Sequence, residues 1–287
     1  MSSERVTTFT NDGLTFDVVD SGPLDGDVVV LLHGFPQRSS CWDQVAPLLH
    51  AQGYRTVAPD QRGYSPGARP SGRKQYTLNR LVGDVLALLD ALGDAGARVH
   101  LVGHDWGSAI GWGVAAAHGD RIRTFTAVSV PHPGAFSKAG LRSPQLLRSW
   151  YIGMFQLPVL PELLAAKRPR DLERILAHAG MRSEDLARFR REILEYGAFP
   201  GGVGYYRGLP FSGGGGFARR VKVPTTLVWS DGDTAVDRAG VDMSGEYVDA
   251  EYELVVLTGV SHWIPEHAPE ALAEAVLERV GGAAGHP

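Results

Sequence analysis

Short apolar runs alternate along the chain with amphipathic stretches. The runs are mostly β-branched and aliphatic, and they are Val28–Leu32, Tyr54–Ala58, Val99–Val102, Phe125–Val130, Thr225–Trp229 and Leu254–Leu257. Near-continuous apolar character, without strict alternation, is typical of parallel strands covered on both faces. The stretches between the runs, such as Leu78–Leu92 and Ala271–Val280, have apolar positions at helical spacing. This order predicts a doubly wound, mostly parallel α/β sheet.

The first strands follow a different pattern. Residues Val6–Val19 resemble an antiparallel hairpin, and we expect it at one edge of the sheet. Asn11-Asp12-Gly13 would form its turn, because these residue types tolerate the positive φ of tight hairpins.

The alternation of strand and helix stops between residues 133 and 220. This part of the chain contains helix-like stretches without a convincing strand, and it ends in four glycines at 213–216; the stretches are Leu141–Phe155, Pro161–Ala166, Asp171–Ala179 and Glu184–Tyr196. Glycine runs form flexible links. We therefore predict a helical cap, residues 133–220, inserted between two parts of an α/β core, residues 1–132 and 221–287.

Composition narrows the classes of partner. The formal net charge of −4 disfavours nucleic acid and anionic membranes as partners, because both attract basic surfaces.

No apolar run approaches the roughly 18 residues that span a bilayer, and the first ten residues lack a secretory pattern. Cys41 is the only cysteine, so an internal disulfide is impossible. We expect a cytoplasmic protein; its oligomeric state stays open, with a homodimer as one option.

The segment Gly103-His104-Asp105-Trp106-Gly107 carries the strongest chemical signal. It follows an apolar strand and precedes a helix of small residues. Glycines two positions before and after Asp105 match the nucleophile elbow, in which a strained strand-to-helix turn presents a nucleophile. The usual nucleophile is serine, and here it is aspartate. Two other interpretations are an N-cap aspartate and a loose dinucleotide loop, but a carboxylate would repel the pyrophosphate that such a loop binds.

Two further segments complete a catalytic pattern in the expected chain order. Trp229-Ser230-Asp231-Gly232-Asp233 follows one late strand, and Gly259-Val260-Ser261-His262-Trp263 follows the next. A nucleophile, an acid and a histidine in this order indicate a triad of Asp105, Asp233 and His262, with Asp231 as the alternative acid.

An oxyanion site is predicted beside the elbow. The loop His33-Gly34-Phe35-Pro36 follows the first buried strand. In folds with a nucleophile elbow, the loop at this position supplies one backbone N–H to an oxyanion, and the residue after the nucleophile supplies a second. Phe35 and Trp106 are the predicted donors.

With these residues in view, the chain resembles the epoxide hydrolases of the α/β-hydrolase superfamily and their dehalogenase relatives. The resemblance extends over nearly the whole chain, through HGFP at 33–36, DQRGYS at 60–65, GHDWGS at 103–108 and GVSHW at 259–263. It implies the α/β-hydrolase fold. The GHDWG elbow is the specific motif, since most of the superfamily has serine at its centre.

The resemblance also implies roles for cap residues. Epoxide hydrolases hold and protonate the epoxide oxygen with two cap tyrosines. The segment Trp150–Pro158 matches their first tyrosine segment, which gives this role to Tyr151, and Gly204–Arg207 matches the second, which gives it to Tyr206. Tyr205 stays open as the alternative. The further substrate-binding candidates are His33, Trp150, Phe155 and Tyr205, and Leu157, Phe199 and Phe211 are expected to add apolar lining.

The implied reaction needs no metal or cofactor. A carboxylate is already ionised at neutral pH and can attack saturated carbon directly. Asp105 would open a small apolar epoxide and form an ester, which water activated by His262 would hydrolyse to a vicinal diol. Dehalogenation by the same aspartate is the alternative, although haloacetate dehalogenases usually have arginine where Trp106 stands. A non-catalytic ligand-binding protein and a serine esterase are less well supported.

Overall fold

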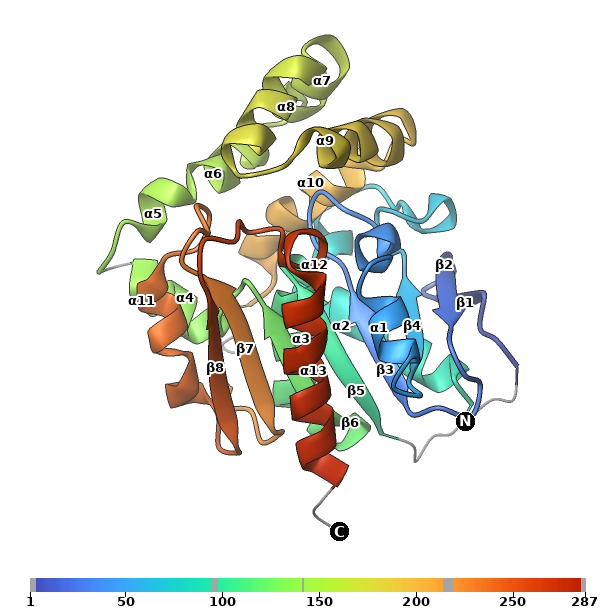
Figure 1. Cartoon of the computed structure of the whole chain (residues 1–287). Helices are drawn as coiled ribbons and strands as arrows, with labels where there is room; N and C mark the ends of the chain where they lie inside the picture. Colours follow the sequence, from blue (N-terminus) through green and yellow to red (C-terminus); the bar gives the residue numbers. More distant parts are fainter. Residues whose placement is uncertain (1–3, 94–97, 141, 214–218, 285–287) are drawn as a thin grey trace.

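A computed structural model describes residues 4–93, 98–140, 142–213 and 219–284 of the chain. An eight-stranded sheet forms its centre, in the order β1-β2-β4-β3-β5-β6-β7-β8 (Figure 1). The strands are β1 (Thr8–Asn11), β2 (Leu14–Ser21), β3 (Val28–Leu32), β4 (Arg55–Pro59), β5 (Val99–His104), β6 (Ile122–Val128), β7 (Thr225–Ser230) and β8 (Tyr252–Leu257). All pairs from β4 to β8 are parallel, whereas β1–β2 and β2–β4 are antiparallel. The predicted mostly parallel α/β fold is confirmed.

The edge hairpin forms as the sequence predicts. Strands β1 and β2 are joined at Asp12 and Gly13, whose φ angles are 52° and 74°. Both values lie in the left-handed region that aspartate and glycine tolerate best, so the turn chemistry fixes the register of the hairpin.

Helices cover both faces of the sheet. Two helices pack with one apolar cluster on one face, α2 (Leu78–Ala91) and α3 (Trp106–Ala117), and a second cluster joins α1 (Ala46–His50) and α13 (Pro269–Ala284) to the other face. Strand β3 is buried along its whole length between these layers. Burial on both faces explains why its sequence is continuously apolar. Two shorter helices, α11 (Arg238–Asp242) and α12 (Ile264–His267), follow β7 and β8.

The segment between β6 and β7 is helical where the structure describes it, and its helices extend over one end of the sheet (Figure 1). We call residues 133–220 the cap segment. Its helices are α4 (Pro133–Gly140), α5 (Gln145–Arg148), α6 (Trp150–Gln156), α7 (Leu160–Lys167), α8 (Pro169–His178), α9 (Ser183–Phe189), the π-helix η5 (Arg190–Glu195) and α10 (Phe199–Gly208). Within the described ranges, no helix has both the length and the apolar character needed to cross a bilayer.

The structure corrects two details of the sequence prediction for this part, and a third falls mostly outside the described residues. The predicted helix Leu141–Phe155 begins only after Pro144, because proline is disfavoured inside a helix, and it is interrupted at Ser149 between α5 and α6. Helices α4 and α10 were not predicted, since their glycines lower helix propensity. Of the glycine run at 213–216, residues 214–216 lie outside the described residues.

Candidate active site

Asp105 lies at the sharp turn from β5 into α3. Its backbone has φ 52° and ψ −115°, a strained conformation for a residue with a side chain. A Cβ on Gly107 would lie 2.1 Å from the Leu32 carbonyl oxygen, and one on Gly103 would lie 2.3 Å from the Gly107 oxygen. No side chain fits at such distances, so the glycines allow the turn to approach β3 closely. This is the collision that the elbow spacing predicts.

The carboxylate of Asp105 faces a cavity and does not cap its helix. No side-chain cap hydrogen bond forms at the start of α3, which removes the interpretation of Asp105 as a simple N-cap. Oδ1 accepts the Phe35 N–H at 2.7 Å. Burial raises the pKa of Asp105, but His262, His104 and the Phe35 amide outweigh it and hold the pKa below its usual value. Asp105 is therefore an ionised carboxylate at neutral pH.

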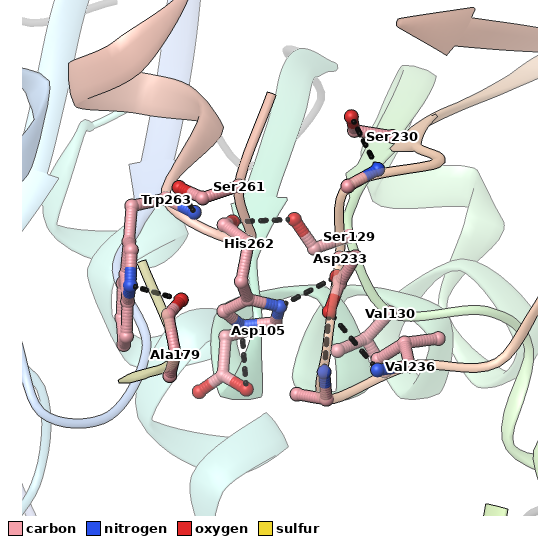
Figure 2. A network of polar contacts seen from close by, with 12 residues as sticks. Asp105, Ser129, Val130, Ala179, Ser230, Asp233, Val236, Ser261, His262 and Trp263 are labelled. Carbon is pink, nitrogen blue, oxygen red and sulfur yellow. Dashed lines mark hydrogen bonds and ion pairs between the residues drawn. The ribbon is translucent and has the colours of Figure 1, made fainter. Parts of the chain in front are cut away.

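His262 lies between two carboxylates (Figure 2). Its Nδ1 is 2.7 Å from Asp233 Oδ2, and its Nε2 is 3.6 Å from Asp105 Oδ2. Burial lowers the pKa of His262, but the charges of Asp233 and Asp105 raise it more strongly, to about 10. In the free protein His262 is consequently an imidazolium that balances part of the carboxylate charge.

The two candidate acids after β7 have different partners. Asp233 is buried and also accepts the N–H groups of Ala235 at 2.7 Å and Val236 at 3.0 Å through Oδ1. These bonds orient its other oxygen toward His262. Asp231 accepts the Gly259 N–H at 2.6 Å instead. Geometry favours Asp233 over Asp231 as the partner of His262.

A cavity of about 440 Å³ lies between the cap segment and the elbow. Asp105 and His262 form its polar floor, and its walls are largely apolar side chains from both parts of the chain, including Phe35, Met154, Phe155, Leu172, Leu176, Phe189, Phe199 and Trp263. Trp150 and Ile175 line the cavity too, yet they are 55% and 42% exposed, so they mark its mouth. A site of this kind suits a small apolar molecule.

Tyr151 on α6 and Tyr206 on α10 enter the same cavity from the cap segment. Their rings meet edge to face, with centroids 5.8 Å apart. Burial and the charge of Asp105 raise the pKa of both phenols well above its ordinary value. Both hydroxyls therefore remain protonated hydrogen-bond donors near the Asp105 carboxylate.

Some predicted binding residues do not line this cavity. Tyr205 turns away from Tyr206 and packs in the core against Tyr64, Tyr76 and Trp106. Neighbouring positions on a helix point in directions about 100° apart, so only one of the two tyrosines can reach the cavity.

His33 is also directed into the core. It is fully buried, and its Nε2 accepts the Gln61 N–H at 3.0 Å, which holds the loop that carries Phe35. Leu157 and Phe211 are about half exposed and lie outside the cavity lining. Of the predicted binding residues, Trp150, Phe155 and Phe199 lie in its wall.

Several cavity residues were not predicted from the sequence. The amphipathic helix α8 contributes Leu172, Ile175 and Leu176. The sequence shows the apolar spacing of this helix but not the surface that its apolar face contacts. Trp263 lines the cavity beside His262. His104 donates from Nε2 to the His262 carbonyl at 3.0 Å and so supports the loop from the core.

Comparison with known proteins shows the family of the chain. The model of the "Alpha/beta hydrolase family" matches residues 29–275. The chain belongs to the alpha/beta hydrolase family. It is 32% identical to "AB hydrolase superfamily protein YfhM" of Bacillus subtilis, over 97% of this chain and 98% of the relative.

Several of the proteins that are similar to the chain are epoxide hydrolases. Epoxide hydrolase 3 of Xenopus tropicalis is 32% identical over 93% of this chain and 75% of the relative. The crystal structure of epoxide hydrolase VrEH1 from Vigna radiata superimposes with a TM-score of 0.81 at 28% identity, covering 96% of this chain and 97% of that one. The predicted resemblance to epoxide hydrolases is confirmed.

Proposed function

We propose that the protein hydrolyses epoxides to vicinal diols through an alkyl ester on Asp105. One observation carries the proposal: a single apolar cavity contains an ionised carboxylate and two protonated phenols, those of Tyr151 and Tyr206. Opening an epoxide needs a nucleophile at carbon and a proton donor at oxygen. The epoxide hydrolases among the relatives support the same conclusion.

In the first step, Oδ2 of Asp105 attacks an epoxide carbon. Oδ2 is the free oxygen, because Oδ1 accepts the Phe35 N–H. The C–O bond of the ring breaks, and its electron pair moves to the epoxide oxygen. Tyr151 and Tyr206 both stabilise this oxygen by hydrogen bonds, and one of them protonates it and becomes a phenolate. The product of this step is a hydroxyalkyl ester, in which Asp105 no longer carries a charge.

In the second step, water attacks the Cγ of the ester. His262 first gives its Nε2 proton to the phenolate formed in the first step, which restores the phenol. It then takes a proton from this water through Nε2, while its Nδ1 remains on Asp233. The negative charge that develops on Oδ1 is stabilised by the Phe35 N–H and by the Trp106 N–H, which is the first amide of α3 and has no partner within the helix. The tetrahedral intermediate then collapses, and His262 returns the proton to the leaving alkoxide to give the diol. The new carboxylic acid of Asp105 passes its proton to Nε2 of His262, which restores the carboxylate and the imidazolium. Neither step requires a metal or cofactor.

The cap segment, residues 133–220, is part of the proposal as a lid domain over the elbow. It provides both phenols and most of the apolar wall. The substrate is accordingly a small apolar epoxide that enters beside Trp150.

A decisive experiment uses His262→Gln, which removes the base but not the nucleophile. Incubation with styrene-type and aliphatic epoxides should give an intact mass increased by one substrate, and peptide mapping should place the adduct on Asp105. Asp105→Asn is the matched control and should stay unmodified. The wild-type protein, after turnover in ¹⁸O-water, should carry label in Asp105.

Three outcomes would contradict the proposal. The first is the absence of any adduct across the epoxide panel. The second is an adduct on another residue. The third is release of halide from haloalkanes or fluoroacetate with no diol from any epoxide, which would assign the same carboxylate to dehalogenation.

A further inference from the structure

Both sequence neighbours of His262 are connected to the cap segment. On one side, Trp263 donates from its indole Nε1 to the Ala179 carbonyl at 3.1 Å (Figure 2). On the other side, the hydroxyl of Ser261 is 2.6 Å from Nδ1 of His267. His262 is therefore flanked by two residues whose side chains lead away from the core and toward the same part of the cap segment, around the turn between α8 and α9.

A chain of buried hydrogen bonds continues from Ser261 to α9. Nε2 of His267 is 2.8 Å from Asp185 Oδ2, and both side chains are only 4% exposed. When His267 carries its proton on Nε2, it donates to the carboxylate, and its Nδ1 accepts the Ser261 hydroxyl. The Ser261 oxygen also accepts the Trp263 N–H at 3.3 Å. Every donor in this series of hydrogen bonds then has an acceptor, and the series links the residues on either side of His262 to each other.

A second connection lies beside the first. Arg188 of α9 pairs with Asp185 at 3.2 Å and with Glu266 of α12 at 3.5 Å. Glu266 in turn accepts a hydrogen bond at 2.5 Å from Nε2 of Gln37, which lies two residues after Phe35 in the sequence. Helix α9 thus contacts α12, which directly follows residues 259–263, the loop that carries His262 and that we call the histidine loop.

Asp105 depends much less on the cap segment. Its strained backbone is fixed by β5 and α3, and its Oδ1 is held by the Phe35 N–H, all within the core. The core also holds the backbone of His262, whose carbonyl accepts from Ser129 at 2.9 Å and from His104 at 3.0 Å. The flanking side chains, in contrast, are oriented from the cap segment.

We propose that Ser261, His267 and Asp185 are positioning residues through which the cap segment orients His262 for hydrolysis of the ester. This inference rests on the proposed function, in which His262 acts only in the second step. Loss of this hydrogen-bond chain should slow hydrolysis of the ester and leave formation of the ester unchanged, because the Asp105 nucleophile and the two phenols do not depend on it. Small errors in the position of a catalytic base can cost large factors in rate.

The test follows single turnovers of Ser261→Ala and Asp185→Asn with an epoxide by rapid quenching and intact-mass analysis. Formation of the ester should stay within about twofold of wild type, while its decay slows about tenfold or more, so that ester accumulates. Glu173→Gln is the matched control: Glu173 pairs with Arg190 inside the cap segment, at 2.7 Å, and does not reach the histidine loop. Both of its rates should match those of wild type.

Asp185 also accepts the Arg182 N–H in the first turn of α9, so its substitution can weaken the cap segment itself. Ser261→Ala avoids this problem because it leaves α9 intact. If the residues act as one chain, the double variant should be no slower in ester decay than Asp185→Asn alone.

The inference fails if ester decay in both single variants stays within twofold of wild type, or if formation and decay slow equally. It also fails if Glu173→Gln slows decay as much as Ser261→Ala does. If no variant, His262→Gln included, ever forms an ester, then the proposed function itself is wrong.

Discussion

The charge of His262 should change during the catalytic cycle. In the free protein its pKa is about 10, raised by Asp233 and Asp105 against the effect of burial. An imidazolium cannot accept a proton from water, yet the second step needs a base. Formation of the ester removes the charge of Asp105. Asp105→Asn imitates that loss, since the amide has nearly the shape of the carboxylate and no charge.

The distance between the groups gives the size of the effect. With Nε2 and Oδ2 3.6 Å apart, removing one unit charge at an effective dielectric constant of about 20 costs the imidazolium roughly 4.6 kcal/mol. Each change of 1 in a pKa corresponds to about 1.4 kcal/mol, so the pKa should fall by about 3, from about 10 to about 7. A value near 7 is suitable for a general base at neutral pH.

The measurement is a pH titration by ¹⁵N NMR of histidine-labelled protein. The chain has ten histidines, so the resonances of residue 262 are assigned by their disappearance in His262→Gln. Asp231→Asn is the control, because Asp231 binds the Gly259 N–H, and it should leave the pKa of His262 unchanged. A His262 pKa in Asp105→Asn within 1 of the wild-type value would refute the reasoning, as would titration of His262 near pH 7 in the wild type.

Three other predictions follow from the described contacts. Tyr151→Phe or Tyr206→Phe should slow ester formation from epoxides about a hundredfold, with ester decay unchanged in single turnovers, because each removes one donor to the leaving oxygen. His100 is buried beside Thr124 and Arg123, and burial, aided by Arg123, lowers its pKa from 6.5 to about 4. The unfolded chain therefore binds a proton on His100 that the folded chain does not, and stability is lost as the pH falls from 6.5 toward 4. In His100→Gln, the free energy of unfolding, measured with urea, should fall by about 2 kcal/mol less between pH 7 and pH 5 than it does in the wild type. Finally, removing the buried carboxylate that pairs with the fully buried Arg62, by Asp84→Ala, should lower the free energy of unfolding by about 3–5 kcal/mol in the same assay, because the guanidinium keeps only the partly exposed Asp12, at 3.4 Å, as a counter-ion.

The parts of the fold and site that the sequence predicts depend on local rules. The strand Val28–Leu32 is readable because a strand buried on both faces must be apolar throughout. The elbow is readable because a strained turn against β3 excludes side chains at two fixed positions around Asp105. Chain order then brings Asp233 and His262 to the same end of the sheet.

Other features depend on packing that single-sequence patterns do not contain. Helix α10 has glycines at positions that disfavour helices, yet its Gly201 packs directly on the Gly63 backbone, where a Cβ would lie 2.1 Å from the carbonyl oxygen. Tertiary contact thus overrides helix propensity. Because of the phase of that helix, Tyr206 faces the cavity and Tyr205 the core. The bond between His267 and Asp185 joins residues 82 positions apart and has no local signal.

An aspartate nucleophile at the elbow, in place of serine, also changes the step at which His262 must be a free base. A serine nucleophile is neutral, so its histidine partner must be a free base before attack. Asp105 is already ionised, and its charge holds His262 in the protonated form. In the proposed mechanism, formation of the ester neutralises that charge, which lowers the proton affinity of His262 just before a base is needed. In this mechanism the charge of Asp105 sets the order of the two steps, and the phenolate left by the first step is the acceptor for the proton that His262 gives up.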